Sequence, residues 1–394
     1  MAQQIHPFQI DIQSSELDRL QDKLESSRHP KNEVVPGAGS DYGFPNEWAV
    51  NMLDYWKAKF SWPEAQKKMN QWPHFTAEIE GQTIHFIHQR SSKPEAIPLL
   101  LVHGWPGSFH EFSEVIDPLT EGADDAPAFH CIVPSLPGFT FSSPPQRHGW
   151  TVKDTARVFH KLMQRLGYNK YCAQAGDWGQ FPVRELGAKY SNSCSVIHLN
   201  WCPAALPENL KEEDLTDRER GTRDKIIDWR TNHIGYAVLM RTRPHALGWM
   251  LQDNPLGLLA FVGEKYIEAS NPKIQDTDKW KDHILTTVCL YYFTDCIMTS
   301  GLVYYENTPH HKFAEYCMSE ENLIKCPFSY TSYWYDTSPN SKRAVERTGN
   351  LVAYKERDYA GHFACLEDPD GVVEDVREIV TNHWAKAFKS GYWP

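Results

Sequence analysis

An aspartate occupies the centre of the stretch AGDWG at residues 175–179, directly after the apolar-leaning run at 171–173. A tight strand-to-helix turn that exposes a reactive side chain needs small residues two positions to either side of it. A carboxylate at the tip is already anionic near pH 7, whereas a serine needs a base to take its proton before it attacks. The spacing therefore indicates Asp177 as a nucleophile suited to displacement at carbon. Taken alone, the stretch also fits a turn or helix-capping aspartate.

A carboxylate nucleophile would form a covalent alkyl ester, and hydrolysis of that ester requires donors for an oxyanion. The loop HGWPG at 103–107 follows a continuous apolar run, where hydrolases with this type of elbow place one backbone donor. The N–H of the residue after the nucleophile supplies the other. We therefore expect the backbone N–H groups of Trp105 and Trp178 to form an oxyanion hole. A simple Pro-Gly turn would explain the composition of the loop but not its position.

Ester hydrolysis also requires a base to activate water and a carboxylate to orient that base. His362 lies in YAGHFACLEDPD, after an expected strand and before the last expected helix, which matches the chain order nucleophile, acid, histidine. Asp336 follows the strand pattern CPFSYTSYWY and is the expected orienting acid. Asp295 and Glu306 are weaker alternatives because they fall within a region that we expect to form a helical lid.

Strand and helix patterns alternate around these residues. Residues 75–88 alternate between apolar and polar side chains and predict a hairpin that turns at Glu80 and Gly81. Continuous apolar runs in IPLLLV and FHCIVP predict strands covered on both faces, as in a parallel sheet. The helix pattern TARVFHKLMQRLG and the strand patterns KYCAQ, SVIHLNW and NLVAYKE extend the alternation. We therefore expect an open, mostly parallel α/β sheet flanked by helices.

The chain divides into four segments by pattern. Residues 1–74 contain two helix patterns joined by a turn-rich stretch and predict an N-terminal helical wrap, with Ser15 as the cap of the first helix. Residues 75–205 and 321–394 carry the strand patterns and predict two parts of one core. Between them, residues 206–320 show helical patterns without strand alternation, which indicates a helical lid inserted into the core.

The composition limits the kinds of partner. Of the 394 residues, 41% are hydrophobic and 23% charged, as in a globular protein. A formal charge of −11 argues against nucleic acid or an anionic membrane as the main partner, so a small neutral ligand fits better. The sequence shows no signal peptide or membrane anchor, so we expect a cytoplasmic protein. The nine cysteines form no CxxC pair and predict buried thiols, and we expect no metal and no cofactor.

Taken together, the motifs resemble those of the microsomal-type epoxide hydrolases, including their soluble fungal relatives. The resemblance covers nearly the whole chain and includes LLLVHGWPGSFHEF, PSLPGFTFS, AGDWG, DNPLGLLAFVGEKY and GHFACLEDP. It implies an α/β-hydrolase fold with a helical lid, a reaction of an epoxide with water, and Asp177 as nucleophile, His362 as base and Asp336 as acid. It also implies two lid tyrosines, at Tyr236 and Tyr304, and is compatible with a homodimer.

Paired tyrosines suit the opening of an epoxide ring. A phenol with a pKa near 10 stays protonated at neutral pH, yet it can hydrogen-bond and then protonate an emerging alkoxide. Tyr304 and Tyr305 are adjacent, and at helical spacing they point about 100° apart, so only one can face a common site. We expect Tyr304, because the family pattern is Tyr, any residue, Glu, Asn. The context SYWYDTSPN differs from the proline-rich surroundings that the family resemblance implies for the acid. The assignment of Asp336 as the acid therefore depends mainly on its spacing from His362.

Two other functions stay open at this stage. A haloalkane dehalogenase also uses an aspartate nucleophile, but a halide leaving group needs N–H donors without acidity, so paired tyrosines favour the epoxide. A non-catalytic ligand receptor with a hydrolase fold could keep the pocket without turnover. Such a receptor would not need the complete set of catalytic parts, which again favours the enzyme.

Overall fold

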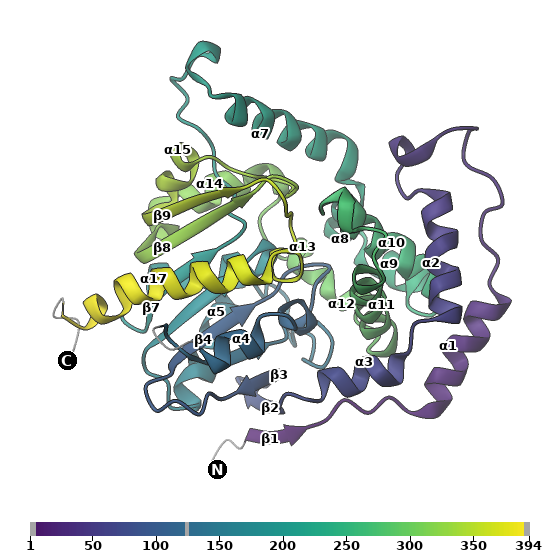
Figure 1. Cartoon of the computed structure of the whole chain (residues 1–394), viewed down its shortest axis with the longest axis horizontal. Helices are drawn as coiled ribbons and strands as arrows, with labels where there is room; N and C mark the ends of the chain where they lie inside the picture. The colour runs from purple at the N-terminus through teal and green to yellow at the C-terminus, as the bar shows by residue number, and fades with distance from the viewer. Residues whose placement is uncertain (1–4, 123–125, 390–394) are drawn as a thin grey trace.

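Figure 1 shows the computed structural model, which describes residues 5–122 and 126–389. Its described strands form one sheet in the order β1-β2-β3-β5-β4-β6-β7-β8-β9. The pairs β1/β2, β2/β3 and β3/β5 are antiparallel, and all pairs from β5 to β9 along the sheet are parallel. The strands are β1 (Ile5–Phe8), β2 (His74–Ile79), β3 (Gln82–Gln89), β4 (Ile97–Val102), β5 (Phe129–Pro134), β6 (Tyr171–Ala175), β7 (Cys194–Leu199), β8 (Ile324–Tyr333) and β9 (Gly349–Arg357).

Helices cover the parallel part of the sheet on both faces. Every residue of β6 and β7 is buried, as continuous apolar-leaning runs predict. Both α6 (Gln180–Lys189) and α17 (Pro369–Lys389) pack on β7, α4 (Ile116–Glu121) packs on β5, and α5 (Val152–Arg165) packs on α6. In Figure 1, α17 and α4 lie across the same face of the sheet. The expected α/β sheet with flanking helices is confirmed.

The predicted hairpin is also confirmed. β2 and β3 pair along their length from His74↔Ile87 to Ile79↔Gln82. The two residues between them, Glu80 and Gly81, have φ values of 55° and 77°, which is the left-handed conformation of a type I′ turn. This turn matches the twist of the two strands and therefore sets their register.

The N-terminal segment is mainly helical, as expected, but it also contains a strand that the sequence patterns do not indicate. β1 forms the edge of the sheet and pairs with β2. Four residues that include Pro7 give little strand signal, yet an edge strand tolerates proline because one row of its N–H groups needs no partner. The first helix, α1 (Ser14–Ser26), follows Gln13, so Ser15 lies in the first turn and not at the cap.

The three N-terminal helices lie beside the helices that follow β7 (Figure 1). α1 contacts α10, α2 (Asn46–Ala58) contacts α10 and α11, and α3 (Trp62–Met69) contacts α11. Trp62 packs on Phe293 of α11 with ring centroids 4.8 Å apart. The N-terminal helices therefore support the region that the sequence predicts to be the lid.

Between β7 and β8 the described chain forms only helices and loops. The α-helices there are α7 (Asp217–Asp228), α8 (Gly235–Thr242), α9 (Pro244–Leu251), α10 (Pro255–Glu268), α11 (Asp278–Phe293), α12 (Ile297–Ser300), α13 (Leu302–Tyr305) and α14 (Phe313–Met318). Two short helices, α15 (Lys342–Val345) and α16 (Ala364–Glu367), follow later. We propose 206–320 as a lid, 1–74 as the segment that supports it, and 75–205 with 321–394 as the core.

All nine cysteines are buried free thiols. Among residues 5–122 and 126–389, no helix is both long enough and apolar enough to cross a membrane. Within the same ranges, no group of three or more His, Cys, Asp or Glu side chains has the arrangement of a metal site.

Candidate active site

Asp177 lies on a tight turn between β6 and α6. Its φ is 40°, in the left-handed region, and it begins the short helical turn Asp177–Gly179. A Cβ at Gly179 would overlap the Val102 carbonyl oxygen, and a Cβ at Gly176 would lie 2.6 Å from the Asn200 Nδ2 atom. Gly176 and Gly179 are therefore needed because residues at the ends of β4 and β7 lie too close for a larger side chain. They allow the Asp177 carboxylate to project from the carboxyl end of β6.

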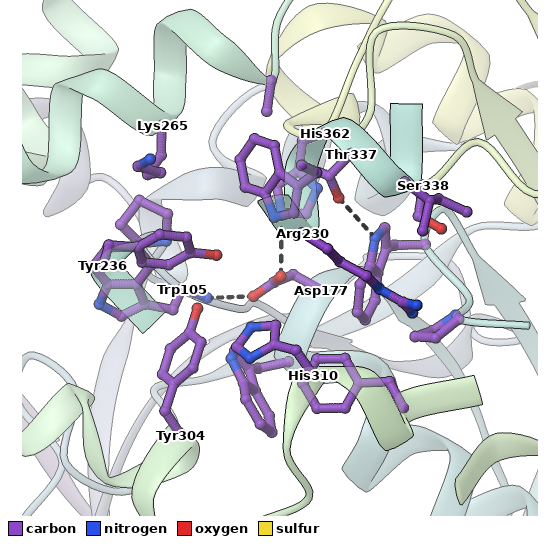
Figure 2. A pocket seen from close by; sticks show the side chains of 18 of the residues that line it. Trp105, Asp177, Arg230, Tyr236, Lys265, Tyr304, His310, Thr337, Ser338 and His362 are labelled. Carbon is purple, nitrogen blue, oxygen red and sulfur yellow. Dashed lines mark hydrogen bonds and ion pairs between the residues drawn. The ribbon is translucent and has the colours of Figure 1, made fainter. Parts of the chain in front are cut away.

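The Asp177 carboxylate contacts two groups from different parts of the core (Figure 2). The Trp105 backbone N–H donates to its Oδ1 atom at 2.7 Å. Its Oδ2 atom lies 3.3 Å from His362 Nε2. Gly104 leaves room for this arrangement, because a Cβ there would overlap the carboxylate. One oxygen is thus held by the backbone while the other faces the imidazole.

His362 joins Asp177 to a second carboxylate. Its Nδ1 atom lies 2.7 Å from Asp336 Oδ1, and Asp336 is only 1% exposed. Burial alone would lower the pKa of His362, but the carboxylates of Asp336 and Asp177 outweigh it and raise that pKa well above 6.5. The resting site therefore holds an imidazolium between two carboxylates. The carboxylate of Asp336, not that of Asp295 or Glu306, makes this contact.

The loop that carries His362 is fixed by Glu367 of α16. The Glu367 carboxylate accepts hydrogen bonds from the Asn271 N–H at 2.9 Å and from the Phe363 N–H at 3.3 Å. The N–H of His362 itself donates to the Ala269 carbonyl at 2.8 Å. Burial raises the pKa of Glu367 to about 7, although these backbone donors oppose the rise. The motif GHFACLEDP thus contains both the imidazole and its support.

Two tyrosines enter the site from the predicted lid. Tyr236 of α8 and Tyr304 of α13 point their hydroxyl groups toward Asp177 (Figure 2). Tyr304 is 2% exposed and Tyr305 is 50% exposed, so Tyr304 is the one that faces the site. Burial, and then the charge on Asp177, raise the pKa of Tyr236. Burial and the neighbouring Tyr236 and Asp177 likewise raise the pKa of Tyr304, so both phenols are protonated at neutral pH.

Aromatic contacts orient both phenols. The ring of Tyr236 stacks on that of Trp105, with centroids 5.0 Å apart and an angle of 15°. The ring of Tyr304 meets Trp178 edge-on at 4.8 Å and stacks on His310 at 5.4 Å. Trp105 therefore contributes twice, since its N–H holds Asp177 and its ring holds Tyr236. Trp178 follows Asp177 directly in the turn, and a role for its N–H in an oxyanion hole stays a prediction.

The side chains of Asp177, His362, Tyr236, Tyr304, Trp105 and Trp178 line one cavity. Its wall is completed by Pro106, Trp201, Pro203, Ile226, Trp229, Arg230, Lys265, Ala269, His310, Phe313, Thr337, Ser338 and Phe363. Of these, Pro106, Lys265 and Phe363 fall within the motifs that carry the family resemblance. The others come from scattered loops and helices, so their presence depends on tertiary packing and not on local sequence.

Glu111 is a buried carboxyl group within the motif LLLVHGWPGSFHEF, and the sequence patterns assign it no role. Its Oε2 atom occupies the space that a Cβ at Gly107 would fill. Burial raises the pKa of Glu111 to about 8; the charge on Asp177 adds to the rise, and His362 opposes it. At neutral pH the group is therefore mostly a neutral acid packed under the HGWPG loop.

This raised pKa predicts how stability depends on pH. In the unfolded chain Glu111 releases its proton near its ordinary pKa of 4.5, whereas in the folded protein it keeps the proton up to about pH 8. Ionisation of Glu111 therefore lowers the free energy of unfolding of the wild type between about pH 5 and pH 8. The variant Glu111→Gln lacks that loss, so its stability relative to wild type should increase with pH, by at most about 1.4 kcal/mol per pH unit. Urea unfolding at several pH values measures the difference.

The exposed Glu121→Gln variant is the matched control and should show no such trend. A constant stability difference between wild type and Glu111→Gln across this pH range would contradict the assignment of a neutral, buried acid.

Comparisons with known proteins identify the family of the chain. Residues 5–112 match the family described as "Epoxide hydrolase N terminus", and residues 97–223 match the alpha/beta hydrolase fold. The juvenile hormone epoxide hydrolase of Bombyx mori is 33% identical over 95% of this chain and 86% of its own length. Epoxide hydrolase 1 of Sus scrofa is 29% identical over 95% of this chain and 88% of its own length. The solved structure of Aspergillus niger epoxide hydrolase is 33% identical, covers 97% of both chains and has a TM-score of 0.88. The chain therefore belongs to the epoxide hydrolase family and has the α/β-hydrolase fold.

Proposed function

We propose that this protein hydrolyses epoxides to vicinal diols through an ester of Asp177. The observation that carries the proposal is the opposition of two kinds of group across one cavity. A carboxylate with one oxygen on a backbone N–H and the other beside His362 faces two protonated phenols, Tyr236 and Tyr304. Such a pair can bind the oxygen of a strained ring while the carboxylate approaches one of its carbons.

In the first half-reaction the Oδ2 atom of Asp177 attacks a ring carbon. A new C–O bond forms to the carboxylate, the C–O bond of the ring breaks, and its electron pair stays on the ring oxygen. Tyr236 and Tyr304 hydrogen-bond that oxygen and protonate it as its negative charge develops. The Oδ1 atom stays on the Trp105 N–H, which leaves Oδ2 as the attacking atom.

Ester formation prepares His362 to act as a base. In the resting site, the charges of Asp177 and Asp336 both favour the protonated imidazole. Alkylation removes the charge of Asp177, so the imidazolium becomes more acidic and its proton can replace the one that a tyrosine has given to the new hydroxyl group. His362 is then neutral, and Asp336 keeps it oriented through Nδ1.

In the second half-reaction neutral His362 takes a proton from water, and the hydroxide attacks the ester carbonyl. We propose that the N–H groups of Trp105 and Trp178 hold the oxyanion of the tetrahedral intermediate. Collapse of that intermediate breaks the bond between the Asp177 carbonyl carbon and the substrate oxygen, and the leaving alkoxide takes the proton of the acid group formed on Asp177. The diol is released, and the carboxylate of Asp177 is restored with the imidazolium beside it. The proton count at the end equals that at the start.

Blocking the second half-reaction should trap the ester. The variant His362→Gln keeps a hydrogen-bonding side chain but cannot take a proton from water. After incubation with styrene oxide, mass spectrometry should find an adduct of intact substrate mass on the peptide that contains Asp177. The double variant with Asp177→Asn is the control and should carry no adduct. Diol formation by wild type without any adduct on His362→Gln would contradict the proposal.

Tyr304 and the adjacent Tyr305 allow a controlled test of the proton donor, because the same substitution can be made at both positions. Tyr304→Phe removes a hydroxyl that points at Asp177, so ester formation should slow by about 100-fold. Tyr305→Phe changes an exposed side chain and should leave the rate within about twofold of wild type. Stopped-flow fluorescence in single turnovers measures both rates. Equal effects of the two substitutions would exclude Tyr304 as a donor.

A bromoalkane offered to the same enzyme tests the dehalogenase alternative. Phenols that protonate an alkoxide do not assist the departure of a halide. We therefore expect bromide release to be slower than diol formation from an epoxide. Faster bromide release than diol formation would favour the dehalogenase.

A further inference from the structure

Lys265 carries a buried positive charge at the wall of the active-site cavity. It belongs to α10 and to the motif DNPLGLLAFVGEKY, to which the proposed reaction gives no role. Its side chain is only 5% exposed. Figure 2 shows it beside Tyr236, on the side of the cavity where the lid provides the phenols.

The ammonium group of Lys265 is held in place from two directions. Two carboxylates of its own helix pair with it: Glu264 at 2.7 Å, and Glu268 in a closer contact. Its Nζ atom lies 4.6 Å from the centre of the Tyr236 ring and 5.4 Å from that of Trp229. Glu268 is itself fixed by His233, whose Nδ1 atom is 2.6 Å away. The charge therefore has a defined position over the face of one proposed proton donor.

On the basis of the proposed function, we propose that Lys265 is a positioning residue for epoxide ring opening that acts through Tyr236. It fixes the phenol ring by a cation–π contact and stabilises the negative charge that reaches Tyr236 when the ring oxygen takes its proton.

The direction of charge movement supports this role. Before the reaction the negative charge is on Asp177; after alkylation Asp177 is a neutral ester and the charge is shared by the ring oxygen and its phenol donors. The charge thus moves toward the tyrosine that Lys265 contacts. An interaction that is stronger in the transition state than in the ground state accelerates the step, whereas equal binding of both would not.

The surroundings of Tyr236 make a compensating cation necessary. Burial raises the pKa of Tyr236, and the carboxylates of Asp177, Glu268 and Glu264 raise it further. Without the Lys265 ammonium group, no positive charge would balance the carboxylates of Glu264 and Glu268, and both would disfavour negative charge on the Tyr236 phenol. In the second half-reaction the work is done by His362 and the oxyanion hole, so Lys265 has no comparable part in it.

The test measures the two half-reactions separately in single turnovers with styrene oxide. Lys265→Met should slow ester formation by about tenfold and change ester hydrolysis by less than about twofold. Lys265→Arg, which keeps the charge, should recover most of the lost rate. In a Tyr236→Phe background, Lys265→Met should cost less than about twofold, because the group through which it acts is missing.

Lys281→Met is the matched control, since its Nζ atom lies 5.7 Å from the centre of the Tyr55 ring and away from the cavity. It should leave both half-reactions unchanged. If Lys265→Met does not fold, Lys265→Gln, whose amide can still donate to Glu264 and Glu268, carries the same predictions.

Three results would overturn the role of Lys265 while leaving the proposed function intact: unchanged ester formation, equal slowing of both half-reactions, or an undiminished loss in the Tyr236→Phe background. The last two would mean that Lys265 only supports the structure. Absence of any ester in wild type would instead overturn the proposed function itself, and the role of Lys265 with it.

Discussion

The contact between the Asp177 carboxylate and the His362 imidazolium is the interaction on which the site depends. A carboxylate at the carboxyl end of a buried strand needs a partner for its charge. Here the Trp105 N–H donates a hydrogen bond to it, and the His362 imidazolium supplies the opposite charge. The same pairing links the two half-reactions. While the charge on Asp177 is present, it favours the protonated imidazole. In the reaction that we propose, alkylation removes that charge, and the imidazole can then accept a proton from water.

The site is assembled from parts that the fold holds separately. Asp177, Trp105 and His362 follow the carboxyl ends of β6, β4 and β9, whereas Tyr236 and Tyr304 come from helices between β7 and β8. The phenols therefore meet the carboxylate only when these helices pack on the core. The N-terminal helices contribute indirectly, because they contact α10 and α11 and so support the helix that carries Lys265. Destabilising that contact is expected to disturb the tyrosines before it disturbs Asp177 and His362.

Features could be predicted from the local sequence where a local backbone conformation requires particular residues. The turn around Asp177 requires small neighbours, and the hairpin turn at Glu80 and Gly81 requires left-handed backbone, so both leave a readable pattern. Asp336 followed from chain order alone, and the structure does bring it to His362. The strand β1 escaped notice because its pairing with β2 depends on residues about seventy positions away.

The choice between Tyr304 and Tyr305, and the presence of Glu111 and Lys265 in the site, depend on tertiary packing. The family pattern favours Tyr304, and the physical difference between the two adjacent tyrosines is that Tyr304 is buried whereas Tyr305 is exposed. Glu111 looks like an ordinary charged residue in the sequence, yet its surroundings make it a neutral acid. Lys265 likewise owes its position to Tyr236 on another helix. Glu111 and Lys265 both lie within the motif stretches, but the stretches do not reveal their partners, since these are set by how separate elements pack.

The proposed reaction requires that a protein oxygen, and not a solvent oxygen, makes the first bond to the epoxide carbon. A single turnover in water enriched in the heavy oxygen isotope tests it most directly, with enzyme in excess over substrate. We expect an unlabelled diol, and we expect the peptide containing Asp177 to gain the isotope, because water attacks the ester carbonyl. A labelled diol with an unlabelled Asp177 peptide would contradict the proposed reaction.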